Sequence, residues 1–444
     1  MRRSAWRFLF ISSDIRNRIL ITIMLLIIYR LAAHIPVPGI NRAAIEGVLS
    51  GSGQGQTLLG LLDLLSGGTV SNFSVLAMGV YPYITAQIIL QLLVPIIPAL
   101  QQRMEDDPRE GRKWQEKWTY YLAVPMSALQ AFGQIRIFQQ YAQGGSILNF
   151  PLGLNLPTFT TVLTMTAGTM FAIWLGELIS EHGIRNQGLS LIIFAGIVAR
   201  IPTNLAQLFF SQAQVLPLLL FLVFIIVLTI FAIVYVQEGR RNVPVMYPGR
   251  RVGNRMSMPV KGTLPLMVNM AGMIPIIFAQ SLLTFPAVVA QFFIGSSNAT
   301  VRSIAIWFQN TFGGLSNTYW ILYFFMVVGF TFFYTDVLFS QQNYGENLKR
   351  SGAQVPGVTK GAATQRYLTR VLRRITLPGA IFLGIVAVMP FLVGLIWPIG
   401  GSNTGLLLVS SSGLLIVVGV VRDLYRSIEA ELKLRGYDQA VLVR

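Results

Sequence analysis

Long apolar segments without charge are the feature that most restricts how this chain can fold. The sequence has 444 residues, of which 53% are apolar and only 11% are charged. A typical soluble domain carries about 25% charged residues, so this chain has too few to cover a soluble surface. Its high apolar content also excludes a disordered basic protein. The chain is therefore predicted to be an all-α integral membrane protein.

Ten membrane-spanning helices are predicted from the intervals between charges, because a span needs about 20 mostly apolar residues. The intervals 186–237 and 375–421 are too long for one helix, and each is divided at a polar stretch that contains proline. The predicted spans are residues 19–35, 73–100, 119–135, 158–179, 189–206, 216–236, 263–289 and 317–339, followed by two within 375–421.

Basic residues lie almost entirely on one side of these spans. If the N-terminus is cytoplasmic, the inner segments hold 29 Lys and Arg residues and the outer loops hold three. Cytoplasmic loops of membrane proteins carry such an excess of positive charge, so both termini are predicted to be cytoplasmic. The net charge of +17 is mostly in these inner segments. Residues 1–18 are predicted to form an amphipathic helix on the membrane surface, and residues 423–444 a cytoplasmic tail.

Two spans share a sequence motif. Residues 79–90 (GVYPYITAQIIL) and 272–283 (GMIPIIFAQSLL) agree at six of twelve positions with a constant offset of 193. The shared Gly, Pro and Gln favour a true repeat over coincidence between apolar stretches. Each motif lies in the second span of a set of five, and because five is odd the two sets enter the membrane from opposite faces. Residues 19–206 and 207–422 are therefore predicted to be inverted halves around a central pore, with prolines kinking the helices that line it.

Ionisable side chains are scarce at the predicted midplane. Arg30, Glu177 and Asp336 fall near span ends, where snorkelling or capping explains them. His34 and His182 also lie at span ends, and the chain has no cysteine. These residues offer no catalytic group, metal site or cofactor site, so the sequence argues against an enzyme.

Branched aliphatic residues occupy the midplane instead, Ile84 and Ile277 of the repeat among them. They either pack against lipid or form a hydrophobic constriction that excludes water from a pore. Residues 58–70 form an apolar segment that is too short to span and contains the hinge-like pair Gly67-Gly68. This segment is either an interfacial helix or a re-entrant element that fills a pore.

Motifs along nearly the whole chain resemble those of the SecY family, the channel subunits of the bacterial protein-export translocon. They are YR at 29–30 with IPVPG at 35–39, SGG at 66–68 with residues 78–93, residues 189–199, LPL at 264–266, NMAGMIPIIFA at 269–279, VPG at 355–357 and LLIVV at 414–418. The resemblance implies a ten-helix channel in the bacterial plasma membrane. Such a channel translocates unfolded secretory polypeptides and releases transmembrane segments sideways into lipid.

The resemblance also implies roles for individual residues. The pore ring would be Val80, Ile84, Leu189, Ile193, Ile277 and Ile416. The plug would be the segment 58–70, including Leu61, Leu62, Asp63, Leu64, Leu65, Ser66, Gly67 and Gly68. Spans two and seven would border a lateral gate that includes Thr85, Gln87, Asn269 and Pro275. The partner-binding residues would be Arg250, Arg251, Arg255, Lys360 and Arg366.

The family further implies a set of partners. They are the SecE and SecG subunits, the SecA motor ATPase, the ribosome, signal sequences, nascent or unfolded polypeptide, and anionic lipid. Neither a cofactor nor a direct nucleic-acid substrate is implied.

The connections 237–263 and 341–375 have net charges of +5 and +6. Both are much longer than the about 2–8 residues that join helices in bundles, so they are predicted to dock the motor and the ribosome. Thr359-Lys360 stands where the family usually has Arg-Pro, and Met267 and Asn254 stand where it usually has basic residues. These departures concern the contact that would bind the motor.

Two other functions fit parts of the sequence. A ten-span secondary transporter would need ionisable groups at the midplane for a coupling ion, and the chain is short of them. A non-conducting scaffold or insertase would offer no path for a polar chain.

Overall fold

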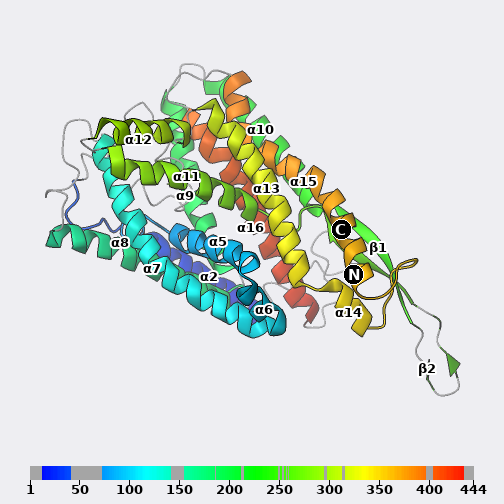
Figure 1. The fold of residues 1–444 in the computed structure, drawn as a ribbon. Coiled ribbons are helices and arrows are strands. Elements are labelled where there is room, and N and C mark those ends of the chain that lie inside the picture. The colour runs from blue at the N-terminus through cyan, green and yellow to red at the C-terminus, as the bar shows by residue number, and fades with distance from the viewer. Residues whose placement is uncertain are drawn as a thin grey trace.

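Helices make up most of the computed structural model, as the uncharged intervals predict. It describes residues 13–41, 73–141, 155–185, 187–211, 215–248, 251–252, 255–256, 258, 260–294, 298–312, 316–396 and 404–434. The helices are α2 (Ser13–Ala32), α5 (Tyr81–Ile96), α6 (Pro98–Asp106), α7 (Pro108–Tyr141), α8 (Leu156–His182), α9 (Gly188–Ser211), α10 (Val215–Glu238), α11 (Ile274–Ile294), α12 (Ala299–Phe312), α13 (Asn317–Gln341), α14 (Tyr344–Arg350), α15 (Ala362–Ile396) and α16 (Thr404–Leu434). A helix occupies each predicted span, and Figure 1 shows the blue and cyan helices below and to the left of the yellow and red ones.

Three of the described segments are long and apolar enough to cross a membrane by length and composition, namely Leu156–His182, Asn317–Arg350 and Ala362–Met389. The pair Tyr81–Val94 and Pro98–Met104 is a fourth if these pieces, which meet at 99°, form one broken span. Three further apolar helices are shorter: Gly188–Ala199, Val223–Glu238 and Ile274–Ala290. The number of ten crossings therefore stays a prediction.

The two copies of the repeat begin their helices in the same way. Gly79 and Gly272 both have a left-handed backbone, with φ of 53° and 65°, and α5 and α11 begin two residues after each glycine. Pro82 and Pro275 are the second residues of these helices, where a missing N–H removes no helical hydrogen bond. The prediction that these prolines kink their helices is therefore wrong, because they start them.

Hydrogen bonds close the turn before each of these two helices. The side chain of Asn269 donates to the carbonyl oxygen of Gly272 and accepts from its N–H, both at 3.0 Å. In the first copy, the N–H of Gly79 donates to the carbonyl oxygen of Leu76 at 2.7 Å. Residues 73–80, which were predicted to open the second span, form turns instead of helix. Both repeat helices thus begin at a defined point after a glycine turn.

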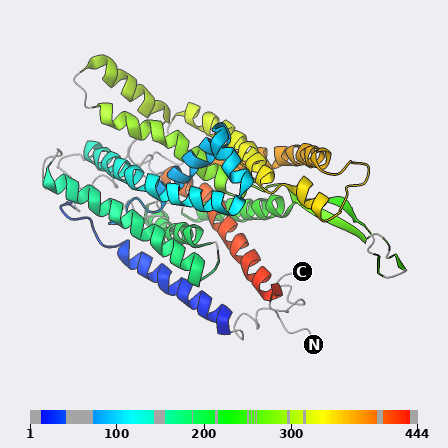
Figure 2. The same ribbon diagram turned by 60° about the horizontal axis from the view of Figure 1, so that its bottom comes forward.

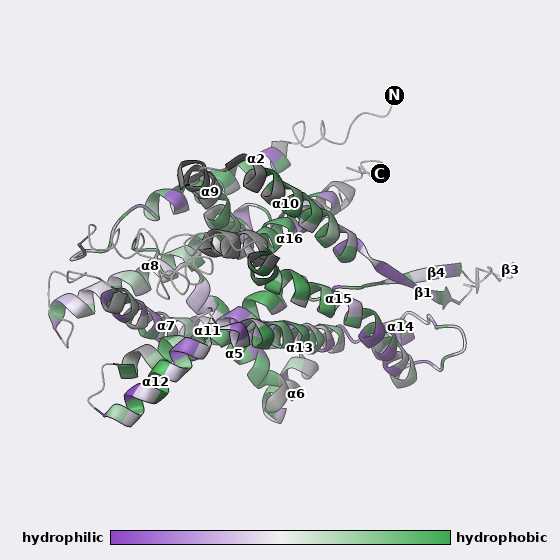
Figure 3. Cartoon of the chain, turned by 90° about the horizontal axis from the view of Figure 1, so that it is seen from above, coloured by the Kyte–Doolittle hydropathy of each residue, from purple (hydrophilic) through white to green (hydrophobic). Residues whose placement is uncertain are grey.

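The two long basic connections contain regular structure that the sequence did not predict. In the first connection, β1 (Arg240–Tyr247) pairs antiparallel with β4 (Val260–Met267), and β2 (Arg251–Val252) pairs with β3 (Arg255–Met256). The prediction that residue 263 opens the seventh span is therefore wrong, because residues 263–267 belong to β4 and the helix α11 begins only at Ile274. In 341–375, α14 is followed by the first turns of α15. The helix α12 is a further unpredicted element. Figure 2 shows the hairpin and α14 projecting from the same end of the molecule, and Figure 3 shows that α14 and parts of the hairpin are hydrophilic.

Glycines allow the elements around the first repeat copy to approach closely. A Cβ on Gly188 at the start of α9 would collide with the carbonyl oxygen of Gly176 on α8. A Cβ on Gly168, also on α8, would collide with the carbonyl oxygen of Val75 in the turns before α5. The helix α8 therefore packs closely both with the turn before α5 and with the beginning of α9, which positions the aliphatic side chains at these two places.

Replacement of Gly272 by alanine should destabilise the protein. A Cβ there has space, since the nearest side-chain atom among the described residues would be a guanidinium nitrogen of Arg422 at 4.0 Å, so the penalty comes from the left-handed φ of 65°. For a residue other than glycine, this conformation costs about 1–2 kcal/mol. Gly272→Ala should therefore lower the thermal unfolding temperature of the purified protein, and Gly272→Asn should lower it less.

The matched control is Gly329→Ala on α13. Gly329 is exposed and helical, and a Cβ there meets nothing within 4 Å. Alanine is favoured over glycine inside a helix by about 0.5–1 kcal/mol, so this variant should keep or raise the unfolding temperature. Equal effects of the two alanine substitutions would contradict the assigned backbone of Gly272.

Candidate functional site

The six aliphatic residues of the predicted pore ring all belong to or pack against the main hydrophobic core, which takes buried side chains from most of the helices. Four of them are almost completely buried, with exposed fractions of 1% for Val80, 5% for Ile193, 6% for Ile277 and 2% for Ile416. Ile84 and Leu189 are partly buried and pack against this cluster. Each half of the chain contributes members, since these residues belong to α5 and its N-terminal turn, α9, α11 and α16.

Local structure explains how the pairs within this set share a face. Val80 and Ile84 are four residues apart, as are Leu189 and Ile193, and side chains with this spacing lie on the same side of a helix. The close contact of α8 with α9 sets the position of the second pair. The arrangement is a buried aliphatic junction between the two predicted halves, and its role as a pore constriction stays a prediction.

The two repeat helices contact each other directly. The hydroxyl of Tyr81 on α5 donates to the carbonyl oxygen of Ser281 on α11 at 3.4 Å. Ile88 of α5 shares a small apolar cluster with Phe278 of α11 and with Tyr334 of α13. The predicted pairing of spans two and seven therefore has a physical contact behind it, with one hydrogen bond between α5 and α11.

The four predicted gate residues lie at or next to this interface, but their polar contacts are local or lead to another helix. Thr85 donates to the carbonyl oxygen of Pro82 at 2.8 Å and accepts from the side chain of Gln130 on α7 at 3.2 Å. Asn269 is held in its own turn, Pro275 is buried in the first turn of α11, and Gln87 is partly buried on α5. The sequence reasoning missed Tyr81, although it lies inside the repeat motif.

Several buried oxygen atoms around this interface have no hydrogen-bond partner among the described residues. They are Gln130 Oε1 and Gln134 Oε1 on α7 and Gln280 Oε1 and Ser281 Oγ on α11. A buried polar atom without a partner costs about 1–3 kcal/mol. The contact of α5, α7 and α11 is therefore weaker than an all-apolar interface of the same size.

The predicted plug, residues 58–70, lies outside the described residues. The same is true of Arg250 and Asn254, between the described parts of the hairpin. Arg251 and Arg255 belong to the short strands β2 and β3 near the hairpin tip. Lys360 is exposed in the turn before α15, and Arg366 is exposed in the first turns of that helix.

The two basic connections join into one folded unit. Met246 of β1 and Gln354 exchange two backbone hydrogen bonds, of 2.8 and 2.9 Å. Beneath them lies a separate hydrophobic core that includes Val243 and Leu266 from the hairpin, and Val355 from the second connection. The docking residues predicted on separate loops therefore belong to a common support.

An ion-pair network ties this unit to the helices. The carboxylate of Glu238, at the end of α10, accepts from Arg240 of β1 at 2.8 Å and from Arg426 of α16 at 2.6 Å. Burial alone would raise the pKa of Glu238, but the hydrogen bonds and charges of the two arginines outweigh burial and hold that pKa below its ordinary value. This carboxylate therefore stays ionised at neutral pH and links three elements.

Asp336 has a partner that the sequence did not predict. Its carboxylate accepts from the guanidinium of Arg373 on α15 at 3.1 and 2.8 Å, which joins α13 to α15. The explanation by capping or snorkelling is therefore wrong for Asp336. Among the residues that the structure describes, no three His, Asp or Glu side chains form a group that could hold a metal ion.

The chain is similar to known proteins along nearly its whole length. The family model described as SecY matches residues 74–425. The chain is 38% identical over 443 residues to protein translocase subunit SecY of Aquifex aeolicus, covering 98% of each chain. It is 37% identical over 435 residues to the subunit of the same name from Thermotoga maritima, covering 96% of this chain and 94% of the relative.

Solved structures share the fold. One described as the structure of a protein conducting channel has a TM-score of 0.62 at 17% identity, covering 95% of this chain and 93% of that one. Another, of Sec61 in a canine ribosome-channel complex from the endoplasmic reticulum, has a TM-score of 0.59 at 17% identity with the same coverage. At this identity the two structures establish the helical channel fold.

Replacement of Glu238 by glutamine should loosen the hairpin at neutral pH, because both of its ion pairs are lost. A carboxyl whose folded pKa is lowered stabilises the fold at neutral pH, and it loses this effect as the pH falls through the lowered value. Hydrogen exchange of the β1 amides should thus be faster in Glu238→Gln than in the wild type at pH 7. The difference should shrink as the sample is acidified.

The control is Glu346→Gln on α14. This carboxylate also faces two cations, Lys349 and Arg350, but at 3.7 Å each, on its own helix and exposed. Exposed pairs of this kind contribute about 0–1 kcal/mol, so exchange in β1 should be unchanged. Equal exchange in β1 for both variants would rule out the linking role of Glu238.

Proposed function

This chain belongs to the SecY family of protein translocase subunits, and we propose that the buried aliphatic junction is its polypeptide-conducting constriction. As a member of this family the chain is a channel component and not an enzyme. The observation that carries the proposal is that Val80, Ile193, Ile277 and Ile416, from both halves, share one buried cluster. A constriction of aliphatic side chains has no charge or hydrogen-bond pattern with which to reject a sequence, and it excludes water when closed.

The domain organisation follows from this proposal. Residues 19–206 and 207–422 are the two inverted halves, and the segment 58–70 is the plug that seals the channel at rest. The similar left-handed backbone of Gly79 and Gly272, with φ of 53° and 65°, supports the repeat. The chain lies in the bacterial plasma membrane with both termini in the cytoplasm, where its basic segments are.

Transmembrane segments of substrates leave sideways between α5 and α11. Support comes from the contact of these helices, which includes one 3.4 Å hydrogen bond from Tyr81 to Ser281. Breaking this contact exposes buried oxygens that have no partner in the closed arrangement, so separation costs less than it would for a tightly bonded pair. Signal sequences bind in this gate, because an apolar helix can take the place of α5 or of α11 as the packing partner of the other.

The joined hairpin and second connection form the docking surface for the SecA motor and the ribosome. Basic side chains are exposed on a support with its own core, and the canine Sec61 relative was solved with a ribosome. SecE and SecG are the partner subunits in the membrane, and anionic lipid surrounds the basic face. Thr359-Lys360 shifts the motor contact from the family's Arg-Pro pair to neighbouring basic residues.

A photo-crosslinking residue at Ile193 or at Ile277 should react with a secretory polypeptide that is stalled during export. Both positions lie in the proposed constriction, so a chain passing through it must touch them. The matched control is Phe325 on α13, which is 65% exposed on the outer face and should react with lipid only. Silence at both ring positions during stalled export would refute the channel assignment of this cluster.

Neutralisation of four docking arginines should impair export driven by SecA. We expect Arg250→Gln, Arg251→Gln, Arg255→Gln and Arg366→Gln together to reduce export at least several-fold and to weaken its dependence on salt, because charge pairing with the partner is lost. Membrane insertion of the channel itself should be unchanged, which immunoblotting of membranes would show.

The control removes the same charge from another cytoplasmic segment. Arg109, Arg112, Lys113 and Lys117 are exposed on α7, in the segment 101–118 where basic and acidic residues balance. Their joint replacement by glutamine should leave SecA-driven export close to that of the wild type. If both quadruple variants behave alike, the docking surface is wrongly placed.

A further inference from the structure

The helix α12 is too short to cross a membrane. It has 14 residues, whereas a spanning helix needs about 20. It packs mainly against α11, and its side chains of Ala305 and Gln309 are buried in that contact. Figure 1 shows α12 beside α11, at the end of the molecule opposite to the hairpin and α14. With the hairpin on the cytoplasmic side, α12 therefore lies on the outer side.

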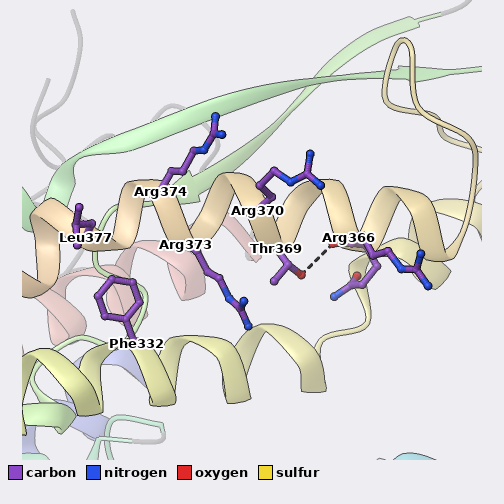
Figure 4. A pocket seen from close by; sticks show the side chains of 8 residues that line it. Phe332, Arg366, Thr369, Arg370, Arg373, Arg374 and Leu377 are labelled. Carbon is purple, nitrogen blue, oxygen red and sulfur yellow. Dashed lines mark hydrogen bonds between the residues drawn. The ribbon is translucent and has the colours of Figure 1, made fainter.

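The depth of α12 relative to the membrane follows from α13, the next helix along the chain. Near the cytoplasmic end of α13, Asp336 binds Arg373 at 2.8 Å, and Figure 4 shows Arg373 pointing toward α13 from the arginine-rich start of α15. Nineteen residues separate Asp336 from Asn317, where α13 begins. At about 1.5 Å per residue this distance is about 28 Å, which matches a hydrocarbon core of about 30 Å. The N-terminus of α13 and the end of α12, five residues earlier, thus lie at the outer boundary of the hydrocarbon.

The side chains of α12 fall into three sectors around its axis, at about 100° per residue. The first sector contains the buried and half-buried residues that face the protein: Val301, Ala305, Phe308, Gln309 and Phe312. The second contains two exposed apolar side chains and two threonines: Thr300, Ile304, Trp307 and Thr311. The third is exposed and mostly polar: Arg302, Ser303, Ile306 and Asn310. The exposed surface of the helix therefore has an apolar side and a polar side.

Trp307 is held in place by a series of aromatic contacts. Its ring meets Phe308 edge-on with 5.1 Å between the centroids, and Phe308 stacks on Phe312 at 5.7 Å. Phe312 in turn packs against the main hydrophobic core. Trp307 is nevertheless 59% exposed, and Ile304 is 54% exposed. The protein thus fixes the indole in position and leaves much of its surface for a partner outside the chain.

Apolar exposure continues on both neighbours of α12. Phe293, at the end of α11, is 50% exposed, and Ile321, within the first two turns of α13, is 58% exposed. The helix α12 itself has one basic residue, Arg302, and no acidic residue. Its exposed apolar side therefore belongs to a weakly charged region around the outer ends of two predicted spans.

We propose that α12 is an interfacial anchor that inserts Ile304 and Trp307 into the outer leaflet of the membrane. Arg302, Ser303 and Asn310 face the water above it. Amphipathic helices lie in this way with the apolar face about 5–10 Å into the boundary between headgroups and acyl chains. Tryptophan is enriched there because its ring is apolar and its N–H is polar. The anchor attaches the outer end of α11 to the membrane surface.

The size and charge of the exposed side distinguish lipid from other occupants. A specific protein interface takes about 20–30 residues from each partner, and the apolar sector of α12 offers Ile304 and Trp307. The same shortage applies to a second copy of this chain. With Arg302 as its one charged residue, α12 inserts by apolar burial and does not depend on the charge of the headgroup. The inference rests on the proposed function only in that α11 and α13 cross the membrane with α12 on the outer side.

The test uses the absence of cysteine from the chain, which allows one dye to be attached at a chosen position. Ile304→Cys and Ser303→Cys place a nitrobenzoxadiazole dye on neighbouring residues of different sectors. The full chain is studied in phosphatidylcholine nanodiscs with one copy per disc. At 304 the dye should emit at shorter wavelength and be quenched by phosphatidylcholine with a spin label near the headgroup. At 303 it should be quenched several times more strongly by aqueous iodide.

Two further positions calibrate these signals. Phe325→Cys on α13 lies eight residues beyond Asn317, about 12 Å deeper in the bilayer, so a spin label deeper in the acyl chain should quench it best. Lys360→Cys is exposed in the turn before α15 and gives the value for a dye in water.

Variants of Trp307 test the anchor itself. In the Ile304→Cys chain, Trp307→Ser should increase iodide quenching at 304 several-fold, because the main apolar contact with lipid is lost. Trp307→Phe should keep most of the protection. The matched control is Asn310→Ser on the polar side, which should change nothing.

Four results would overturn the proposal. Equal iodide quenching at 303 and 304 would place the whole helix in water, and equal lipid quenching at both would place it inside the hydrocarbon. A short emission wavelength at 304 only in discs with two copies would identify an interface between copies. A requirement for added phosphatidylglycerol would show that charge, and not apolar burial, holds the helix. None of these readouts involves export, so they remain interpretable if the channel proposal fails.

Discussion

The structure depends on one constraint, which is that backbone N–H and C=O groups inside lipid must be paired within the protein. This favours helices throughout the apolar segments and restricts irregular backbone to places where other groups pair with it. The turns that precede α5 and α11 are such places. In one, the side chain of Asn269 pairs with both backbone groups of Gly272 at 3.0 Å. In the other, the N–H of Gly79 pairs with the carbonyl oxygen of Leu76. A left-handed glycine and a proline in the first turn then allow each helix to begin without a lost hydrogen bond.

The starting points of these two helices determine what lies between the halves. Val80 is the residue before α5, and Ile277 lies in the first turn of α11, so the glycine turns bring aliphatic side chains to the junction. Ile84 also lies in the first turn of α5, and the other members belong to α9 and α16. The helix α9 is positioned by the close approach of Gly188 to α8. The same two helices meet through one hydrogen bond and a small apolar cluster. The buried aliphatic cluster and the weak contact between α5 and α11 therefore both follow from one local feature, a glycine turn before a helix, which occurs twice.

Sequence reasoning predicted the helices well, because the position of charge along the chain reports directly on burial in lipid. It also identified the motif in which Gly, Pro and Gln recur in register, and the structure gives both copies a left-handed glycine two residues before a helix. It misjudged Pro82 and Pro275, although a proline in the first turn is a signal for a helix start, because both prolines lie inside long apolar intervals. The hairpin was missed even though Val243 and Val245 alternate with exposed residues along β1. Partners distant in sequence, such as Asp336 and Arg373 or Tyr81 and Ser281, could not be predicted, since they depend on how helices pack.

The positive charge of the chain serves more than orientation, and α15 shows how the uses are separated. In its first turns, Arg366 is close to the docking unit, whose core includes Leu368 and Leu372 of the same helix. About two turns further, Arg373 is neutralised by Asp336 and fixes α15 to α13. Among the residues that the structure describes, Arg370 and Arg374 have no acidic partner, and they lie at the point where the exposed face of the helix turns apolar. Orientation alone would require only that these residues stay on the cytoplasmic side.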